Sequence, residues 1–515
     1  MPDPTTMNGQ RRPSRPRRVA QLIGVTAIAA LLWTSCSDSG ALVVEVGSRN
    51  LDEVDSANGG PDDVGDDADN ELIDDSGSRI PIGDFDDGFP LDSSKPGRSY
   101  DRFLIDAIDD IERFWADNYS KAYGGEYVEL RGGVHPAYPG RDSDLPTGCQ
   151  FVGNYEDVRD NAFYCDEGDF IVYDDAGLFP EFADEFGAAT VAVIMAHEWG
   201  HAIQSSTRRD ILYSFVTTTL ELQADCFAGA WAGHVQENGL NGYRFSQSDI
   251  TGALLGLIQI GDAPGSTAYD PSAHGSAFDR VSAFQDGFTG GVVSCVDYES
   301  NEPVPLQFGF TVEELSRPNP GDFPFGDEMF TAMRDDLVVF WEALVDIGEP
   351  WNAPDLLLAD TRDVECATGP TISVAVGVAW CADDNTVVVS SPITKQYYDL
   401  IPGDFAVAYL IGIGYAEAVQ TAIGSNLDAS DRALLNDCLV GMWSGDILPF
   451  NTDPVVPDSE TTPRIVLSPG DLDEAIRTAL TLGDTDGERS MGTPFDKVDA
   501  FRQGVLFGFD GCFAA

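Results

Sequence analysis

The chain has 515 residues, 43% of them hydrophobic, and a formal net charge of −58. This length exceeds what one hydrophobic core usually serves, so two domains are expected. A surface this acidic repels phosphate backbones, which argues against nucleic acid as a partner.

Residues 1–36 are typical of an export signal. Several arginines precede the apolar run Val19–Trp33, which is too short for a membrane span. Cys36 follows small residues, as at a bacterial lipoprotein cleavage site, and this predicts a lipid anchor; a plain secretory signal is the alternative. The Arg17-Arg18 pair also leaves twin-arginine export open. Each reading predicts a mature chain outside the cytoplasm, either in the cell envelope or secreted.

Residues 37–98 are rich in Asp, Gly, Ser and Asn and have no periodic apolar face. This composition predicts a solvated, disordered tether.

The remaining sequence resembles itself. "VAVIMAHEWGHAIQ", starting at Val191, returns as "VAYLIGIGYAEAVQ", starting at Val407. "ADCFAGAWAG" returns as "NDCLVGMWSG", and "HGSAFDRVSAFQDGF" returns as "MGTPFDKVDAFRQGV". Shared helix composition does not explain the matched Cys, Asp and Trp residues. The order of these blocks predicts one domain at 99–300, a linker at 301–327 and a second, related domain at 328–515.

Each predicted unit combines helices with a short β-type stretch. The first opens with a helix whose apolar residues Leu104, Ile108, Ile111 and Trp115 share one face. A β-type stretch such as Phe170–Asp174 follows, then a long apolar helix and further helices. We therefore predict an α+β fold, mostly helical, built from two tandem units.

Apart from Cys36, each unit contains four cysteines, which predicts two disulfides per unit in an exported protein. Sequence alone allows three pairings in each unit. We favour Cys149–Cys165 and Cys226–Cys295, because the first of these pairs closes a short loop. The counterparts in the second unit are Cys366–Cys381 and Cys438–Cys512.

The motif around His197 carries the clearest chemistry. His197 and His201 are four residues apart, so on a helix they share one face and can bind one metal ion. Glu198 lies beside the first histidine, where it can take a proton from metal-bound water. The chain has only five histidines, which makes a chance occurrence improbable. The competing interpretation is a buried helix with two hydrogen-bonded histidines.

A third ligand is expected about one helix later. Glu221 and Asp225 are again one turn apart, and either could complete the site. In the second unit Ala433 stands opposite Glu221, whereas Asp437 stands opposite Asp225. A ligand should disappear together with the histidines, because an unpaired charge in a dry pocket is costly. This favours Glu221 as the ligand, with Asp225 orienting an imidazole.

His274 follows the pattern of the metal group, because Met491 replaces it in the second unit. We expect it to hydrogen-bond the oxyanion of a tetrahedral intermediate or to bind substrate; a plain surface histidine is the alternative. His135 and His234 show no partner pattern and are interpreted as surface or packing residues.

The blocks "AHEWGHAIQ", "ELQADCFAGAW", "IQIGDAP" and "HGSAFDRVSAF" resemble, in this order, the signature of the bacterial neutral zinc metallopeptidase family. The resemblance covers about Tyr100–Cys295. It implies a zincin-like fold, one Zn²⁺ held by His197, His201 and Glu221, and Glu198 as the catalytic residue. The family's substrates are poorly defined, so the resemblance supplies no particular protein or peptide substrate.

The function predicted from sequence is therefore extracytoplasmic hydrolysis of peptide bonds by a zinc-bound water that Glu198 activates. The second unit is expected to be catalytically degenerate, because Ile413, Gly414 and Glu417 stand opposite His197, Glu198 and His201. It is also expected to pack on the first unit. The resemblance further implies, from zincin architecture, that the β-type stretch near Phe170–Asp174 lies along the cleft and pairs with the substrate backbone. The alternative is a non-catalytic envelope binding or scaffold protein that retains a structural zinc site.

Overall fold

A computed structural model describes residues 95–513, except 141–144, 147, 150–151, 208–214, 271, 346–350, 363, 369–370, 376, 460–461 and 484–490. It also describes two short strands, β1 (Leu72–Ile73) and β2 (Arg79–Ile80), which pair antiparallel. The predicted export signal, the predicted lipid anchor at Cys36 and most of the predicted tether lie outside the described residues. At the end of the tether, Lys95 forms ion pairs with Asp101 and Asp175.

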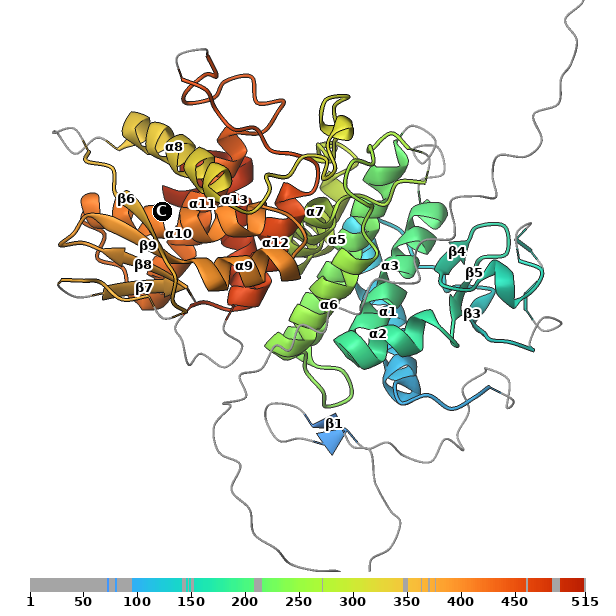
Figure 1. Ribbon diagram of the computed structural model, residues 1–515. Helices are drawn as coiled ribbons and strands as arrows, with labels where there is room; N and C mark the ends of the chain where they lie inside the picture. The colour runs from blue at the N-terminus through green and yellow to red at the C-terminus, as the bar shows by residue number, and fades with distance from the viewer. Residues whose placement is uncertain are drawn as a thin grey trace, which may run out of the picture. The chain divides into compact units, whose positions relative to one another are not determined.

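The first half of the described chain is an opening helix, a small sheet and then further helices (Figure 1). Its elements are α1 (Asp101–Ala122), β3 (Gly133–Ala137), β4 (Ala162–Cys165), β5 (Phe170–Asp174), α2 (Leu178–Phe186), α3 (Ala188–Thr207), α5 (Thr217–Asn238), α6 (Gln247–Gln259) and α7 (Ala277–Asp297).

After a connection that contains a short 3-10 turn (Glu314–Ser316), the second half follows the same order, with one additional strand. Its elements are α8 (Asp327–Leu344), β6 (Asp355–Ala359), β7 (Thr371–Ala375), β8 (Val378–Cys381), β9 (Thr386–Ser390), α9 (Ser391–Leu400), α10 (Phe405–Ala422), α11 (Ala429–Asp446), α12 (Asp471–Leu482) and α13 (Pro494–Phe513). The described chain is therefore a mostly helical α+β protein.

The two larger sheets are mixed, and their cores have the same topology. In the first, the order is β3-β5-β4, with β5 parallel to β3 and antiparallel to β4. In the second, the order is β6-β9-β8-β7, with β9 parallel to β6 and antiparallel to β8. In each half, the first strand therefore pairs with the last strand of its sheet in sequence rather than with its neighbour in sequence.

Central helices α3 and α10 form the core of each half because apolar residues occur all round them. α10 is long and apolar enough to cross a membrane, but most of its residues are buried inside the protein. In α3 a glycine allows close packing, since a Cβ at Gly200 would lie 2.9 Å from the Cα of Ala224 on α5. This close approach of α3 and α5 brings together the helices that carry the predicted metal ligands.

All four predicted disulfides are present, so the predicted pairing is confirmed. In the first half, Cys226–Cys295 joins α5 to α7, and Cys149–Cys165 closes the loop before β4; the equivalent pairs in the second half are Cys438–Cys512 and Cys366–Cys381. Disulfides persist in oxidising compartments, so four of them indicate a location outside the cytoplasm.

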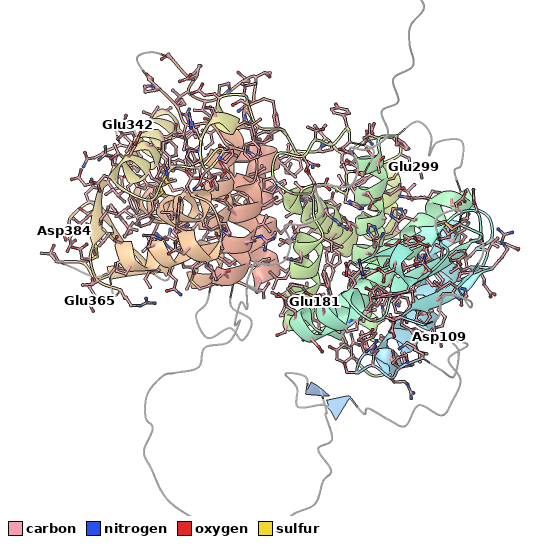
Figure 2. All side chains as sticks on the ribbon, turned by 45° about the vertical axis from the view of Figure 1, so that its right-hand side comes forward. Asp109, Glu181, Glu299, Glu342, Glu365 and Asp384 are labelled. Carbon is pink, nitrogen blue, oxygen red and sulfur yellow. A yellow bond between two sulfur atoms is a disulfide. The ribbon has the colours of Figure 1, made fainter. Side chains whose placement is uncertain are left out.

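The strong negative charge is visible at the surface of both halves. Acidic side chains labelled in Figure 2 are exposed on α1, α2, α8 and two loops of the second half: Asp109, Glu181, Glu342, Glu365 and Asp384. Isolated surface carboxylates are well solvated, so this charge affects solubility and partners rather than the fold.

Candidate metal centre

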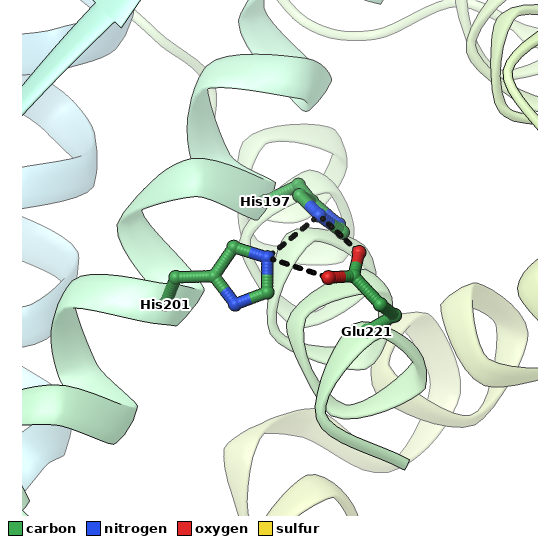
Figure 3. Close-up of side chains that lie close together, drawn as sticks. All are labelled: His197, His201 and Glu221. Carbon is green, nitrogen blue, oxygen red and sulfur yellow. Dashed lines mark hydrogen bonds and ion pairs between the residues drawn. The ribbon is translucent and has the colours of Figure 1, made fainter. Parts of the chain in front are cut away.

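Three donor side chains from two helices meet in the first half. His197 and His201 lie one turn apart on α3, and Glu221 lies near the start of α5. The two histidine Nε2 atoms are 3.1 Å apart (Figure 3). The carboxylate oxygens of Glu221 lie 3.3 Å from Nε2 of His197 and 3.5 Å from Nε2 of His201.

These distances fit a zinc ion. Zinc binds imidazole nitrogen and carboxylate oxygen at about 2.0–2.2 Å, so two tetrahedral ligand atoms are separated by about 3.4 Å. Two imidazoles and one carboxylate are also a common donor set for catalytic zinc, which keeps a fourth position open. Calcium and magnesium instead require oxygen donors throughout.

Asp225 holds the ring of His197 from the side away from Glu221. Its Oδ1 lies 2.7 Å from His197 Nδ1, which places the ring proton on Nδ1 and directs Nε2 toward the other donors. Arg280 donates from Nε to one Asp225 oxygen and from Nη2 to the other, both at 2.8 Å. The structure therefore places Asp225 behind the donor group, in a buried ion pair, and not among the three donors.

The ring of His201 has its own support. Gln204 Oε1 lies 3.0 Å from His201 Nδ1. The amide of Gln204 is held in turn, because its Nε2 donates to the Leu220 carbonyl at 2.8 Å and to Gln223 Oε1 at 3.1 Å. Both imidazoles thus present Nε2 to the centre and Nδ1 to a fixed acceptor.

The charges around the centre favour a cation. Burial opposes protonation of His197, but the carboxylates of Asp225 and Glu221 outweigh it and raise the pKa of His197 to about 10. Burial opposes ionisation of Glu221, yet the neighbouring histidines hold its pKa well below the usual value. The carboxylates that stabilise a proton on the imidazoles would equally stabilise a metal ion between them.

Glu198 lies beside the donor group without joining it. Its Oε2 accepts the backbone N–H of Tyr164 in β4 at 2.9 Å. Burial raises the pKa of the Glu198 carboxyl group, against the opposing effect of the two histidines. Within the described part of the chain no hydrogen bond to Oε1 is found, so the second oxygen is free to act in the cleft.

A cleft of about 470 Å³ opens over these residues. Its lining includes the three donors, Glu198, His274 and Arg280. The His274 side chain is 55% exposed, and its Nδ1 lies 3.6 Å from Oδ1 of Asp262. Asp262 also accepts the backbone N–H groups of His274 and Gly275, which fixes the loop before α7. His274 therefore stands in the same cleft as the metal group.

His135 and His234 contribute to packing outside this cleft. Nε2 of His135 lies 2.7 Å from the Gly132 carbonyl oxygen, and the ring of His234 packs against Phe114.

The expectation for Phe170–Asp174 is wrong. This segment is β5, the middle strand of the sheet, so β3 and β4 occupy both of its edges. The strand beside the cleft is β4, whose Tyr164 N–H reaches Glu198. An apolar run identifies a buried strand, but its position in the sheet depends on which strands pair with it.

Sequence reasoning also missed Arg280, Tyr164 and Gln204. A signal for Arg280 was available in the sequence. Lys497 stands opposite Arg280 and Asp437 stands opposite Asp225, so both halves keep an acidic and a basic residue at these two positions. Lys497 Nζ indeed donates to Asp437 Oδ2 at 2.6 Å. The Tyr164 contact uses a backbone N–H, which no side-chain motif can reveal.

The comparison with known proteins covers the part of the chain that carries this centre. Residues 153–298 match the sequence model of a family described as "Putative neutral zinc metallopeptidase". The family resemblance drawn from the motifs is thereby confirmed for this segment. The match ends before the second half of the chain.

Among relatives, the chain is 30% identical over 152 residues to "Uncharacterized protein YpfJ" of Escherichia coli strain K12, covering 25% of this chain and 50% of that protein. It is 31% identical over 154 residues to "Uncharacterized protein Rv2575" of Mycobacterium tuberculosis, covering 25% of this chain and 52% of that protein. The chain thus spans about half the length of the curated relatives it matches. No solved structure matches it.

Proposed function

We propose that this chain is an extracytoplasmic zinc metallopeptidase that hydrolyses peptide bonds in proteins or peptides. The observation that carries the proposal is the convergence of His197, His201 and Glu221 in a cleft that also holds the Glu198 carboxyl group. The family match over residues 153–298 supports the same chemistry.

In the proposed site, Nε2 of His197, Nε2 of His201 and the Glu221 carboxylate would hold Zn²⁺. The ion would supply Lewis-acid activation of water and of the scissile carbonyl. Asp225 and Gln204 keep the two rings in the binding orientation through their Nδ1 atoms.

Glu198 moves the proton. The Tyr164 N–H fixes Oε2, so Oε1 takes the proton from the attacking water and later delivers it to the leaving amine. Burial raises the pKa of the Glu198 carboxyl group toward the working pH, which suits a group that must both accept and return a proton. His274 at the cleft is proposed to donate a hydrogen bond to the oxyanion of the tetrahedral intermediate.

The substrate is proposed to bind along β4 as an added strand. β4 lies at the edge of its sheet, and residues Asp160 to Tyr164 line the cleft. Edge strands bind extended peptides through backbone hydrogen bonds, which give affinity without strong sequence preference.

We further propose that the second half is a copy of the first that has lost the metal site. The matching order of elements, sheet pairings and disulfides supports a duplication. At the place of His201, Glu417 is buried in an ion pair with Arg432. At the place of Glu198 stands Gly414, where a Cβ would collide with Val387. The copied helices therefore fill the space that forms the cleft in the first half.

The second half is proposed to support the first through helices near the candidate site. The Phe278 N–H at the start of α7 is 2.9 Å from Asp473 Oδ1 on α12. Gln285 Nε2 on α7 donates to the carbonyl oxygen of Phe495 on α13 at 3.0 Å. Because α7 also carries Arg280, which donates to Asp225, these two contacts would fix α7 and with it the partner of Asp225. Export by the N-terminal signal, with lipidation at Cys36, would place the protein in the cell envelope.

The test uses the full-length chain purified with zinc in the buffer. We expect one zinc ion per chain and cleavage of an unfolded protein substrate. Glu198→Ala should keep the zinc and lose the cleavage, by a factor of roughly 10²–10⁴ for loss of a general base. Equal cleavage by both proteins would refute the catalytic assignment, and one zinc ion without any cleavage would identify a scaffold protein with a structural metal.

A further inference from the structure

A second group of acids meets in the second half, apart from the candidate zinc centre. Asp322 precedes α8, Asp404 precedes α10, and Asp471 is the first residue of α12. One oxygen atom from each of these three carboxyl groups lies within 4.8 Å of the others. Asp404 and Asp471 are each only 5% exposed.

Backbone N–H groups hold one side of this cluster. Oδ2 of Asp404 accepts the Phe323 N–H at 3.0 Å, next to Asp322. Oδ2 of Asp471 accepts the Ser468 N–H at 2.8 Å. The other oxygen of Asp471, Oδ1, is buried and has no hydrogen-bond partner among the described residues. A buried carboxylate oxygen without a partner costs free energy unless something absent from the protein chain satisfies it.

A fourth acid adds to the charge. Glu474 on α12 accepts the Phe405 N–H at 2.8 Å, and a Cβ at Gly403 would collide with its carboxylate. Among the described residues, no basic side chain forms an ion pair with any of these four acids; Arg477, one turn along α12, forms none with them either. Burial raises the pKa of Asp404 to about 7, as expected for acids that lack a counter-charge.

We propose that Asp322, Asp404 and Asp471 form a binding site for one Ca²⁺ ion, to which Glu474 adds negative charge. Calcium binds oxygen donors at about 2.3–2.6 Å, so two of its ligand atoms are at most about 5 Å apart. The donors are all carboxylate oxygens, which suits calcium; zinc prefers nitrogen and sulfur, and magnesium requires a stricter octahedral geometry.

The first half provides an internal comparison. Aligning the two halves places Ala188 opposite Asp404 and Gly252 opposite Glu474, so the first half lacks two of the acids. Asp249, opposite Asp471, caps its helix: its Oδ2 accepts the Ser246 N–H at 2.8 Å and also a hydrogen bond from the Tyr243 hydroxyl. Among the described residues, this group of acids thus forms where the connecting segment meets the second half, away from the candidate zinc centre.

The location suggests what bound calcium would do. The site joins the connecting segment to α10 and α12, which pack against each other (Figure 1). Asp473, two residues after Asp471, accepts the Phe278 N–H of the first half. Calcium would therefore stabilise the packing of the second half and the contact between α12 and α7 when the protein reaches a calcium-containing exterior.

The experiment compares the full-length protein with Asp404→Asn and Asp471→Asn, all with zinc present. Calcium binding is counted by equilibrium dialysis, and the midpoint of thermal unfolding is measured at one fixed zinc concentration, with calcium and in calcium-free buffer. We expect each variant to bind one calcium ion fewer than the wild type. Extracellular sites have dissociation constants of about 0.1–1 mM, so calcium should be supplied at several millimolar. Any calcium that the predicted acidic tether binds is the same in the wild type and the variants, so it cancels from the difference.

The unfolding data give an independent readout. In calcium-free buffer both variants should melt at or above the wild-type temperature, because an amide removes repulsion between buried acids. In calcium only the wild type and the exposed control Glu342→Gln should gain stability. Should a variant fail to fold, Asp322→Asn at the least buried position replaces it. A calcium count equal in wild type and variants, or a wild-type midpoint that calcium does not raise, would overturn the proposal, whatever the peptidase assay shows.

Discussion

Replacing Asp225 with asparagine should damage the protein in two ways that can be measured separately. The carboxylate holds His197 through Nδ1 and neutralises Arg280 through two hydrogen bonds. Asparagine has nearly the same shape, so the cavity stays filled. What changes is the charge. The His197 ring loses a charged hydrogen-bond acceptor, and the Arg280 guanidinium, which is only 1% exposed, loses its counter-charge.

Both effects have an expected size. Loss of a carboxylate that orients a zinc-binding histidine typically weakens metal affinity by about 10–100-fold. A buried charge left without its partner typically costs about 3–5 kcal/mol of stability. Asp225→Asn should therefore bind zinc about 10–100-fold more weakly, and the zinc-free protein should lose about 3–5 kcal/mol.

A second substitution separates the two effects. In the double variant Asp225→Asn with Arg280→Gln the unpaired charge is gone, so most of the lost stability should return while zinc binding stays weak. Asp437→Asn is the matched control, because it breaks the equivalent buried pair with Lys497. It should lose comparable stability and keep full zinc affinity.

Zinc affinity is measured by competition with a chromophoric chelator, and stability by urea unfolding of the zinc-free protein. Unchanged zinc affinity in Asp225→Asn would refute the assigned role of the carboxylate. A loss of zinc affinity in Asp437→Asn as large as that in Asp225→Asn would show that the effect arises from general destabilisation.

Three further outcomes are expected. Gln204→Leu should weaken zinc binding by about 10-fold through His201, whereas Gln420→Leu, at the matching position of α10, should leave zinc binding unchanged; equal effects would contradict this. Burial raises the pKa of Asp279 to about 7, so its stabilising contribution is complete below about pH 4 and is lost as the pH rises through about 7. Asp279→Asn should therefore raise the unfolding midpoint more at about pH 7.5 than at about pH 4.5, and a pH-independent difference would contradict the assignment. Removing the Cys438–Cys512 disulfide by serine substitution should cost about 2–5 kcal/mol in urea unfolding without changing zinc stoichiometry.

The sequence alone determined the features that depend on local spacing and on the similarity between its two halves. A spacing of four positions between two histidines places them on one helix face whatever surrounds the helix. The matched cysteines limited the pairings enough to identify all four bonds. In the second half an alanine stands opposite Glu221, whereas an aspartate stands opposite Asp225. This difference favoured the donor set that the structure brings together, because residues that share one metal ion tend to disappear together.

Tertiary structure decided everything that depends on which distant segments meet. β5 lies in the middle of its sheet because β3 and β4 pair with it from either side, and the composition of β5 carries no trace of that arrangement. Glu198 is held by a backbone N–H, which every residue except proline possesses. Asp322, Asp404 and Asp471 are separated by long stretches of sequence and share no period. Only the packing of α10 against α12 and the path of the connecting segment bring their charges within a few ångströms, where their repulsion requires a cation or protons.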